Sequence, residues 1–217
     1  MFTPLWLTLK VALLATLFAG LAGMALGWWM SRRRFAGHSV VDAALMLPMV
    51  LPPTVLGYYL LVLIGRRGLL GQYLDAWFGI NLIFTWQGAV IAAAIVSLPL
   101  VYKGARAAFE DVDPRFAQAA RTLGATELEV FVRVSLPLAV RGIASGLMLA
   151  FARAMGEFGA TLMIAGNLPG KTQTLSIAVY EAVQAGNDAQ ALWLTLVISV
   201  VCITVLVISS RLLQARH

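Results

Sequence analysis

Five long stretches of apolar residues limit what this chain can fold into more than any other feature of its sequence. A helix needs about 20 apolar residues to cross the ~30 Å hydrocarbon core of a bilayer, and the stretches are of this order. Strands of a membrane barrel are shorter and alternate in polarity. The sequence therefore predicts an all-α, polytopic membrane helix bundle with about five transmembrane helices, at Leu5–Met30, Val40–Ile64, Trp86–Tyr102, Arg141–Ala165 and Ala189–Ser210.

The composition agrees with a membrane protein and excludes several function classes. Of the 217 residues, 60% are hydrophobic and 12% are charged, whereas soluble domains average about 45–50% apolar residues and about 25% charged residues. The motifs of zinc proteases and serine hydrolases do not occur, and the two histidines, His38 and His217, are far apart in the sequence. The chain is therefore predicted not to be an enzyme and to hold no metal or cofactor of its own. The single cysteine, Cys202, is interpreted as a packing residue.

The positive charges predict how the chain is oriented. No basic stripe with interleaved aromatic residues occurs, so nucleic-acid binding is not expected, and the basic residues are expected to contact membrane lipid. Of the 16 Lys and Arg residues, eleven lie in the gaps after the first and third stretches or in the C-terminal tail, and four lie on the opposite side. The positive-inside rule then places the N-terminus outside and the C-terminus in the cytoplasm. The cluster Arg32–Arg34 follows the first stretch, which is therefore expected to be an uncleaved span.

The longest polar segment, residues 103–140, is predicted to be a cytoplasmic insert in a single transmembrane domain that comprises residues 1–217. Asp113 can cap a helix that begins with Pro114, and Gly124 can end this helix in a left-handed conformation. One face of the helix is expected to carry Phe116, Ala119, Ala120 and Leu123.

A second helix is predicted directly after the first. Thr126 and Glu129 have the spacing of a capping box, and Pro137 is expected to end the helix that they begin. The pattern alone leaves two interpretations of the insert. It is either a docking surface for another protein or a solvated hairpin packed against the chain's own spans.

The insert carries a motif that is typical of one protein family. The run Gln118-Ala119-Ala120, then Gly124, then Val134-Ser135-Leu136-Pro137 resembles the EAA loop of bacterial ABC importer permeases, with Gln118 where Glu is usual and Val134 where Ile is usual. The resemblance implies a type I importer permease (MetI-like) fold, in which the short helix is a coupling helix that binds a cytoplasmic ATPase subunit. It places the ATPase contact at Gln118, Ala119, Ala120, Arg121, Leu123 and Gly124.

Two further runs, Leu51–Gly71 and Ala150–Leu175, resemble the permeases for molybdate, with the sulfate and thiosulfate permeases as relatives. The similarity extends from about Leu5 to Ser210. It implies import of molybdate across the bacterial inner membrane by alternating access, with the N-terminus in the periplasm. The implied partners are two copies of a cytoplasmic ABC ATPase, which bind ATP and Mg, a second copy of this chain in a homodimer, and a periplasmic molybdate-binding protein.

Three alternatives to this function stay open. The cargo could be another oxyanion, namely sulfate, thiosulfate or tungstate. The chain could be a channel or secondary transporter that works without an ATPase. It could also be a membrane scaffold that transports nothing.

Candidate pathway residues lie inside two of the predicted spans. Arg153 and Glu157 are ionisable and four residues apart, a pattern that marks either a transport pathway or a structural ion pair. Because a carboxylate would repel an anion, Glu157 is expected to act as a gate or packing element. Pro52 and Pro53 remove helix hydrogen bonds and predict either a break that serves gating or a harmless kink.

The run from Gly166 to Thr172 nearly spells a phosphate-binding loop. Three residues separate its glycines where four are required, so the chain is not expected to bind ATP. Lys171 in this run is interpreted either as a cation that attracts an incoming anion or simply as part of a turn.

Overall fold

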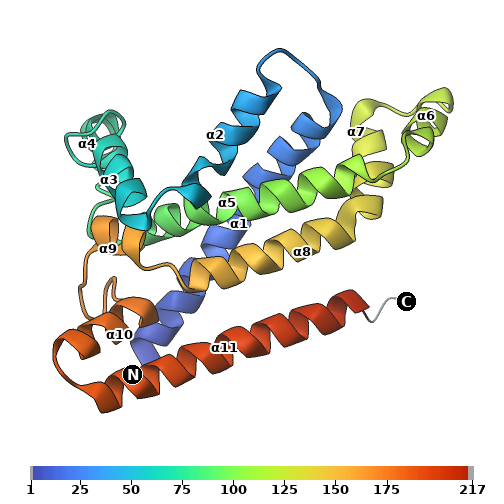
Figure 1. Ribbon diagram of the computed structural model, residues 1–217. Coiled ribbons are helices and arrows are strands. Elements are labelled where there is room, and N and C mark those ends of the chain that lie inside the picture. Colours follow the sequence, from blue (N-terminus) through green and yellow to red (C-terminus); the bar gives the residue numbers. More distant parts are fainter. Residues whose placement is uncertain (1, 215–217) are drawn as a thin grey trace.

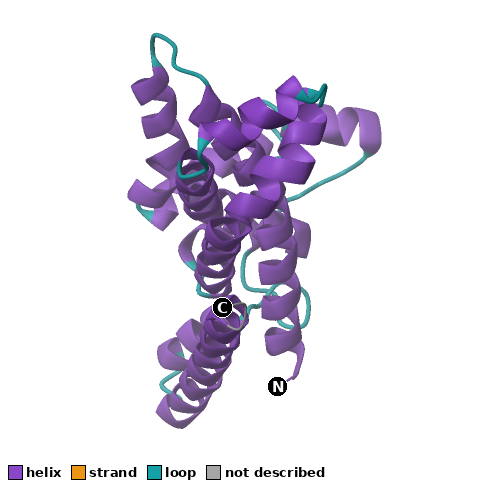
Figure 2. Ribbon diagram, turned by 90° about the vertical axis from the view of Figure 1, so that its right-hand side faces the viewer, coloured by secondary structure: helices purple, strands orange, loops and turns teal. Residues whose placement is uncertain are grey.

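The computed structural model describes residues 2–214, and it consists of helices joined by loops, with no strand among these residues (Figures 1 and 2). His217 lies outside the described residues. The elements in chain order are α1 (Phe2–Arg32), α2 (His38–Val50), α3 (Pro53–Ile64), α4 (Gly71–Phe78), α5 (Trp86–Glu110), α6 (Pro114–Thr122), α7 (Glu127–Val130), a π-helical segment (Phe131–Ser135), α8 (Leu136–Met155), α9 (Gly159–Ala165), α10 (Leu175–Gln184) and α11 (Asp188–Gln214).

Helix α5 lies at the centre of the bundle, between α1 and α8 (Figure 1). The helices approach closely because glycines lie at the contacts that α5 makes with α1 and α8. A Cβ atom added to Gly23 would lie 2.9 Å from the backbone nitrogen of Tyr102, and one added to Gly104 would lie 3.1 Å from the Cα atom of Gly146. Small residues at such contacts are the usual way in which membrane helices pack tightly.

The number of spans agrees with the prediction. Four single helices are long and apolar enough to cross a membrane: Thr3–Arg32, Trp86–Glu110, Glu127–Met155 and Asp188–Ile208. Helices α2 and α3 form a fifth span if they are counted together, although they are bent by 110° where they meet. The predicted break at Pro52 and Pro53 is therefore present, and it is a sharp change of direction.

Two predictions about the helices after residue 125 are wrong. The predicted helix over Arg141–Ala165 is broken, because α8 ends at Met155 and α9 begins at Gly159. The predicted stop at Pro137 does not occur, because the π-helical segment before it lets the helix continue. Its wider turn pairs the Leu136 N–H with the carbonyl oxygen of Phe131, five residues earlier, and such π-bulges absorb a local mismatch in a helix.

The bundle has two distinct ends (Figure 1). Helices α6 and α7 lie at one end, beside the end of α1, where the ring of Trp28 lies 5.1 Å from that of Phe131. Helices α9 and α10 and the beginning of α1 lie toward the other end. Helix α5 extends to Glu110, past its predicted end at Tyr102, and so carries the chain to α6.

Candidate functional site

The hairpin formed by α6 and α7 is built by local capping interactions. The Asp113 side chain accepts a hydrogen bond from a backbone N–H of the first turn of α6, and Pro114 is the first residue of this helix. Gly124 adopts a φ of +86°, the left-handed conformation that the sequence predicted. Thr126 and Glu129 exchange both hydrogen bonds of the predicted capping box.

The outer surface of the α6–α7 hairpin is apolar and uncovered. Leu123 is 88% exposed, and Phe116 and Leu128 are exposed as well, whereas Ala117 is buried against the rest of the chain. Of the predicted ATPase-contact residues, Gln118, Ala119, Arg121, Leu123 and Gly124 are exposed and Ala120 is half-buried. Large apolar side chains that gather on an exposed surface mark a contact site for another molecule.

Charged side chains attach the α6–α7 hairpin to the first span. Arg121 Nε donates to Glu127 Oε1 at 2.6 Å, and Arg32 Nη1 lies 3.3 Å from Glu127 Oε2. Arg32 Nη2 also donates to Ser135 Oγ at 2.7 Å. The hydrogen bond to Glu127 raises the pKa of Arg121, so its guanidinium stays charged. The hairpin is therefore joined to α1 through a carboxylate that two arginines share.

A continuous helical path leads from the hairpin across the bundle. Helix α7, the π-helical segment and α8 together form one helix of 29 residues, Glu127–Met155. At 1.5 Å per residue it is about 43 Å long, close to the full thickness of a bilayer. It ends directly before the break at Glu157.

The breaks in two predicted spans lie side by side and form what we call the α3–α9 junction. A Cβ atom added to Gly159, the first residue of α9, would lie 2.7 Å from Cβ of Pro53, the first residue of α3. One added to Gly57 would lie 2.7 Å from Cβ of Met163. The structure thus brings the predicted pathway residues Pro52 and Pro53 next to the break that follows Arg153.

Glu157 is buried in this break. One carboxylate oxygen, Oε1, accepts a hydrogen bond from the backbone N–H of Ala160 at 2.9 Å, and the other, Oε2, lies 2.8 Å from Arg153 Nη1. The Arg153 side chain is one-third exposed, whereas that of Glu157 is almost fully buried. Glu157 therefore replaces a missing helix hydrogen bond and holds one side of the Arg153 guanidinium, while the other side is accessible.

A groove of about 450 Å³ runs along α2, α5 and α8. On α8 it is lined by small residues and Leu149, and Arg153 follows Leu149 by four residues, on the same face of the helix. Lys103 lines the groove on α5, between Leu100 and Gly104, and its Nζ lies 2.8 Å from Asp42 Oδ2. The groove thus has one cation in its lining, Lys103, and a second, Arg153, one helical turn beyond it, and each is paired with a carboxylate. The α8 residues that line it are Gly142, Ser145, Gly146 and Leu149.

Sequence reasoning missed Asp42. Its carboxylate accepts hydrogen bonds from Tyr102 Oη at 2.6 Å, Arg106 Nη1 at 2.7 Å and Lys103 Nζ, and so joins α2 to α5. Asp42 is the only charged residue in the stretch Val40–Ile64. The rule that an ionisable residue within a span has a role would have identified it.

Lys171 lies apart from these sites. It is exposed in the loop between α9 and α10, and its backbone N–H donates to the carbonyl oxygen of Leu168 at 3.0 Å. This loop follows α9, far from the α6–α7 hairpin (Figure 1). The turn that the sequence offered as one interpretation is present, and the side chain is left accessible.

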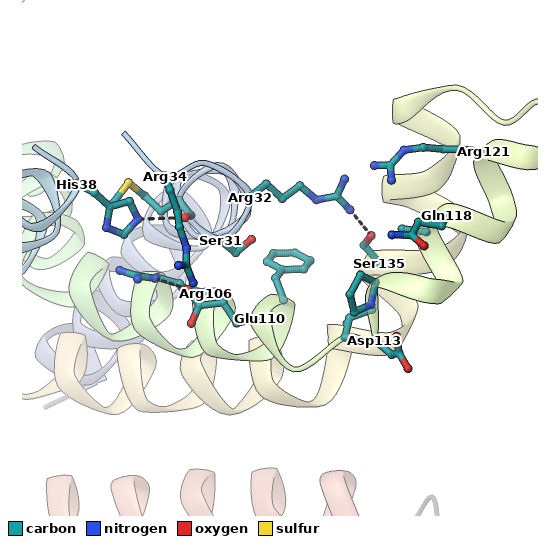
Figure 3. A pocket seen from close by; sticks show the side chains of 15 residues that line it. Ser31, Arg32, Arg34, His38, Arg106, Glu110, Asp113, Gln118, Arg121 and Ser135 are labelled. Carbon is teal, nitrogen blue, oxygen red and sulfur yellow. Dashed lines mark hydrogen bonds and ion pairs between the residues drawn. The ribbon is translucent and has the colours of Figure 1, made fainter. Parts of the chain in front are cut away.

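A cavity of about 850 Å³ lies beneath the α6–α7 hairpin, between the end of α1, the end of α5 and α6. Figure 3 shows that Arg32 and Arg121 approach it from opposite sides, with Gln118 and Ser135 close by, and that Arg34 and Arg106 lie farther along the same wall. No group of three or more His, Cys, Asp or Glu side chains that could hold a metal ion occurs within residues 2–214.

Comparison with known proteins adds the family context. Residues 20–217 match the family described as "Binding-protein-dependent transport system inner membrane component". The chain is 46% identical to the molybdenum transport system permease protein ModB of Escherichia coli K12, over 95% of this chain and 90% of that protein. It is 45% identical to the putative molybdenum transport system permease protein YvgM of Bacillus subtilis, over 94% of this chain and 88% of that protein.

Two more distant similarities agree with the family match. The chain is 38% identical to the sulfate transport system permease protein CysT of Salmonella typhimurium, over 82% of this chain and 64% of that protein. Its fold matches a chain of the inward-facing MetNI methionine ABC transporter with a TM-score of 0.74 and 16% identity, over 98% and 94% of the two chains. The predicted type I importer permease fold is therefore confirmed.

Proposed function

Because the chain belongs to the family of binding-protein-dependent transport system inner membrane components, we propose that it is the permease subunit of an ATP-driven importer and that its cargo is molybdate. The cargo assignment is supported by the difference between relatives. The molybdenum permeases are 45–46% identical over about nine-tenths of each chain, whereas the sulfate permease CysT is 38% identical over a smaller share. The chain itself would be non-catalytic, with ATP and Mg bound by a partner ATPase.

The observation that carries this proposal is the uncovered apolar surface of the α6–α7 hairpin at one end of a continuous helix. An ATPase subunit would dock on this surface, through Leu123 and its neighbours on α6. Two ATPase subunits would serve two copies of the chain, and a periplasmic molybdate-binding protein would deliver the anion at the opposite end. In this orientation the N-terminus is periplasmic and the C-terminus is cytoplasmic.

The geometry also suggests how the nucleotide cycle would reach the pathway. When two ATPase subunits close on ATP, they would draw the hairpins of the two copies together. The helix Glu127–Met155 would carry this movement to the α3–α9 junction, because a helix is stiff over its length. There Arg153 and Glu157, beside Pro52 and Pro53, would open or close the passage, while Lys171 would attract the incoming anion.

The two paired cations in and beyond the groove suit an anionic cargo. A bare cation in the pathway would bind an anion too tightly for release, whereas conduction requires binding that is favourable but weak. Lys103 and Arg153 are each partly neutralised by a carboxylate, at 2.8 Å in both cases. Such partly neutralised cations would offer an anion a weak, transient contact.

Uptake of labelled oxyanions tests the cargo. Proteoliposomes that contain the chain, its ATPase and its binding protein should take up molybdate in a saturable and ATP-dependent manner, and excess sulfate should not compete. Saturable sulfate uptake without molybdate uptake would overturn the cargo. Uptake of either anion without the ATPase would instead support a channel or secondary transporter and overturn the proposed class.

Docking is tested separately, by two substitutions of the same kind. Leu123→Asp should abolish capture of the ATPase in a pull-down, because it places a charge in the apolar contact. Leu69→Asp is the matched control, since Leu69 is also exposed but lies between α3 and α4, away from the α6–α7 hairpin. Equal capture of the ATPase by both variants would contradict docking at this surface.

A further inference from the structure

The cavity beneath the α6–α7 hairpin holds more positive than negative charge. Four arginines line it, against two acidic residues, Glu110 and Asp113. Both acidic residues are already engaged: Glu110 accepts a hydrogen bond from Arg106, and Asp113 caps α6. Arg106 is itself paired with Glu110 and Asp42, so the positive charge that these carboxylates leave unmatched lies on the other three arginines. The four arginines are Arg32, Arg34, Arg106 and Arg121.

Two of these arginines share one carboxylate. Glu127 Oε2 lies 3.1 Å from Arg121 Nη2 and 3.3 Å from Arg32 Nη1. One carboxylate neutralises only one of two guanidinium groups, so the group of three side chains keeps a net charge of +1. An anion that entered between the two arginines would relieve their mutual repulsion.

A third arginine is available on the same wall. Among the interactions found for residues 2–214, none involves the side chain of Arg34, which lines the cavity beside Glu110 and Arg106 (Figure 3). Gln118, from α6, and Ser31, at the end of α1, add neutral polar groups. The forked geometry of guanidinium groups matches the oxygens of phosphate-type anions, which bind such groups through paired hydrogen bonds.

From this arrangement we infer that the cavity is a binding site for a phosphate-type oxyanion, held by Arg34 together with the Arg32–Arg121 pair. The site lies at the end of the first span, just after Trp28 and Trp29, and tryptophans at the end of a span are typical of the level where lipid headgroups lie. The phosphate could therefore belong to an anionic lipid or be free in solution. The inference does not depend on which anion the chain transports.

Such a ligand would add a link between the hairpin and the first span besides the ion pairs of Glu127. Arg121 and Gln118 belong to α6, whereas Arg34 follows the end of α1. An anion bound to both sides would tie the hairpin to the first span. A carboxylate from a docked ATPase would satisfy the same arginines, and this is the competing occupant that the experiment must separate.

The test uses the complex of the chain with its ATPase, purified in neutral detergent. Native mass spectrometry would measure retained phosphatidylglycerol against phosphatidylcholine, and equilibrium dialysis would measure bound ³²P-phosphate. Arg34→Gln should weaken binding of the phosphate-type ligand about fivefold, since one arginine near a membrane surface contributes about that factor. Arg33→Gln is the matched control, because Arg33 does not line the cavity.

Each outcome decides the inference. If Arg34→Gln retains less phosphatidylglycerol than Arg33→Gln but binds as much ³²P-phosphate, the source is a lipid headgroup. If Arg34→Gln binds less ³²P-phosphate but retains as much phosphatidylglycerol, the source is free phosphate. Equal behaviour of Arg34→Gln and Arg33→Gln with both probes would overturn the site. So would a structure of the complex in which an ATPase carboxylate occupies the cavity. Arg34 is exposed, and unchanged thermal unfolding of Arg34→Gln would show that the variant is folded.

Discussion

The α6–α7 hairpin and the α3–α9 junction lie near the two ends of one continuous helix, yet different forces hold them. The hairpin is exposed and is attached to α1 largely by the shared carboxylate of Glu127. The junction is buried, and its helices touch where Gly57 and Gly159 have no side chain. Exposed ion pairs contribute little to stability because water screens them, whereas overpacking a tight contact costs about 1–3 kcal/mol.

This difference predicts how each region responds to change. The hairpin can gain or lose a binding partner at its surface while the fold stays intact. The junction has no room for an added side-chain group, so added volume there should destabilise the whole bundle. Single substitutions should therefore distinguish the two regions. Those in the hairpin should change transport, and those in the junction should change the free energy of unfolding.

The largest effect on stability is expected from Gly159→Ala. The new methyl group would lie 2.7 Å from Cβ of Pro53, so α3 and α9 must move apart, which should cost about 1–3 kcal/mol in the free energy of unfolding. Gly156→Ala is the matched control, because its methyl group would meet nothing closer than 3.9 Å. Thermal unfolding of the purified variants checks this, and equal stability would show that the junction is looser than the structure indicates.

Gly124→Val should have the next largest effect. Its Cβ would meet nothing within 4 Å, so the only cost is that of holding a β-branched residue at a φ of +86°, about 1–2 kcal/mol. We expect the variant to insert normally and to lose coupled uptake, because the turn between α6 and α7 would be distorted.

Gly124→Asn provides the control for this turn, since Asn tolerates the left-handed conformation. It should keep most of the uptake that Gly124→Val loses. Undiminished uptake by Gly124→Val would contradict the role of the turn in coupling.

The same contrast explains what the sequence could and could not predict. The hairpin depends on signals within a few residues, such as Asp113 before Pro114 and the capping box at Thr126, and its helices were predicted closely. The junction depends on contacts between segments about a hundred residues apart, such as Pro53 with Gly159. The break at Glu157 contains no proline, and its flanking glycines, Gly156 and Gly159, are weak stop signals within an apolar stretch that also contains Gly142 and Gly146.

Two further differences have similar causes. Pro137 is a strong local stop signal, and the π-helical segment overrides it within the helix that runs on into α8. The cavity beneath the hairpin depends on Arg32 reaching Ser135, which lies 103 residues later in the chain. A basic cluster was visible at Arg32–Arg34, but its neighbours in space were not.

A double-mutant cycle at Arg153 and Glu157 should give a smaller effect than the glycine substitutions. Glu157→Gln keeps an oxygen for the N–H of Ala160 and removes only the charge that faces Arg153. Because Arg153 is one-third exposed, water can replace part of this interaction, and we expect a loss of about 1 kcal/mol.

The cycle also distinguishes the two interpretations of this pair. If Arg153 contacts the passing anion, Arg153→Gln should lower uptake more than Glu157→Gln does, and the double variant should not recover it. If the pair is purely structural, the double variant should recover both stability and uptake. Recovery of uptake would therefore remove Arg153 from the proposed pathway.

The smallest effect is expected from substitutions of Lys171. They test whether the end of the bundle opposite the hairpin attracts the anion through long-range charge alone. The turn uses the backbone of Lys171, so Lys171→Gln should leave the free energy of unfolding within about 0.5 kcal/mol. Uptake at low ionic strength should fall about twofold and should match the wild type at high salt, because attraction between an exposed cation and an anion is screened. Lys171→Arg should behave as the wild type. Uptake that is equal in all three proteins at low salt would assign Lys171 to the turn only, and would restrict the electrostatic contribution to the paired cations Lys103 and Arg153.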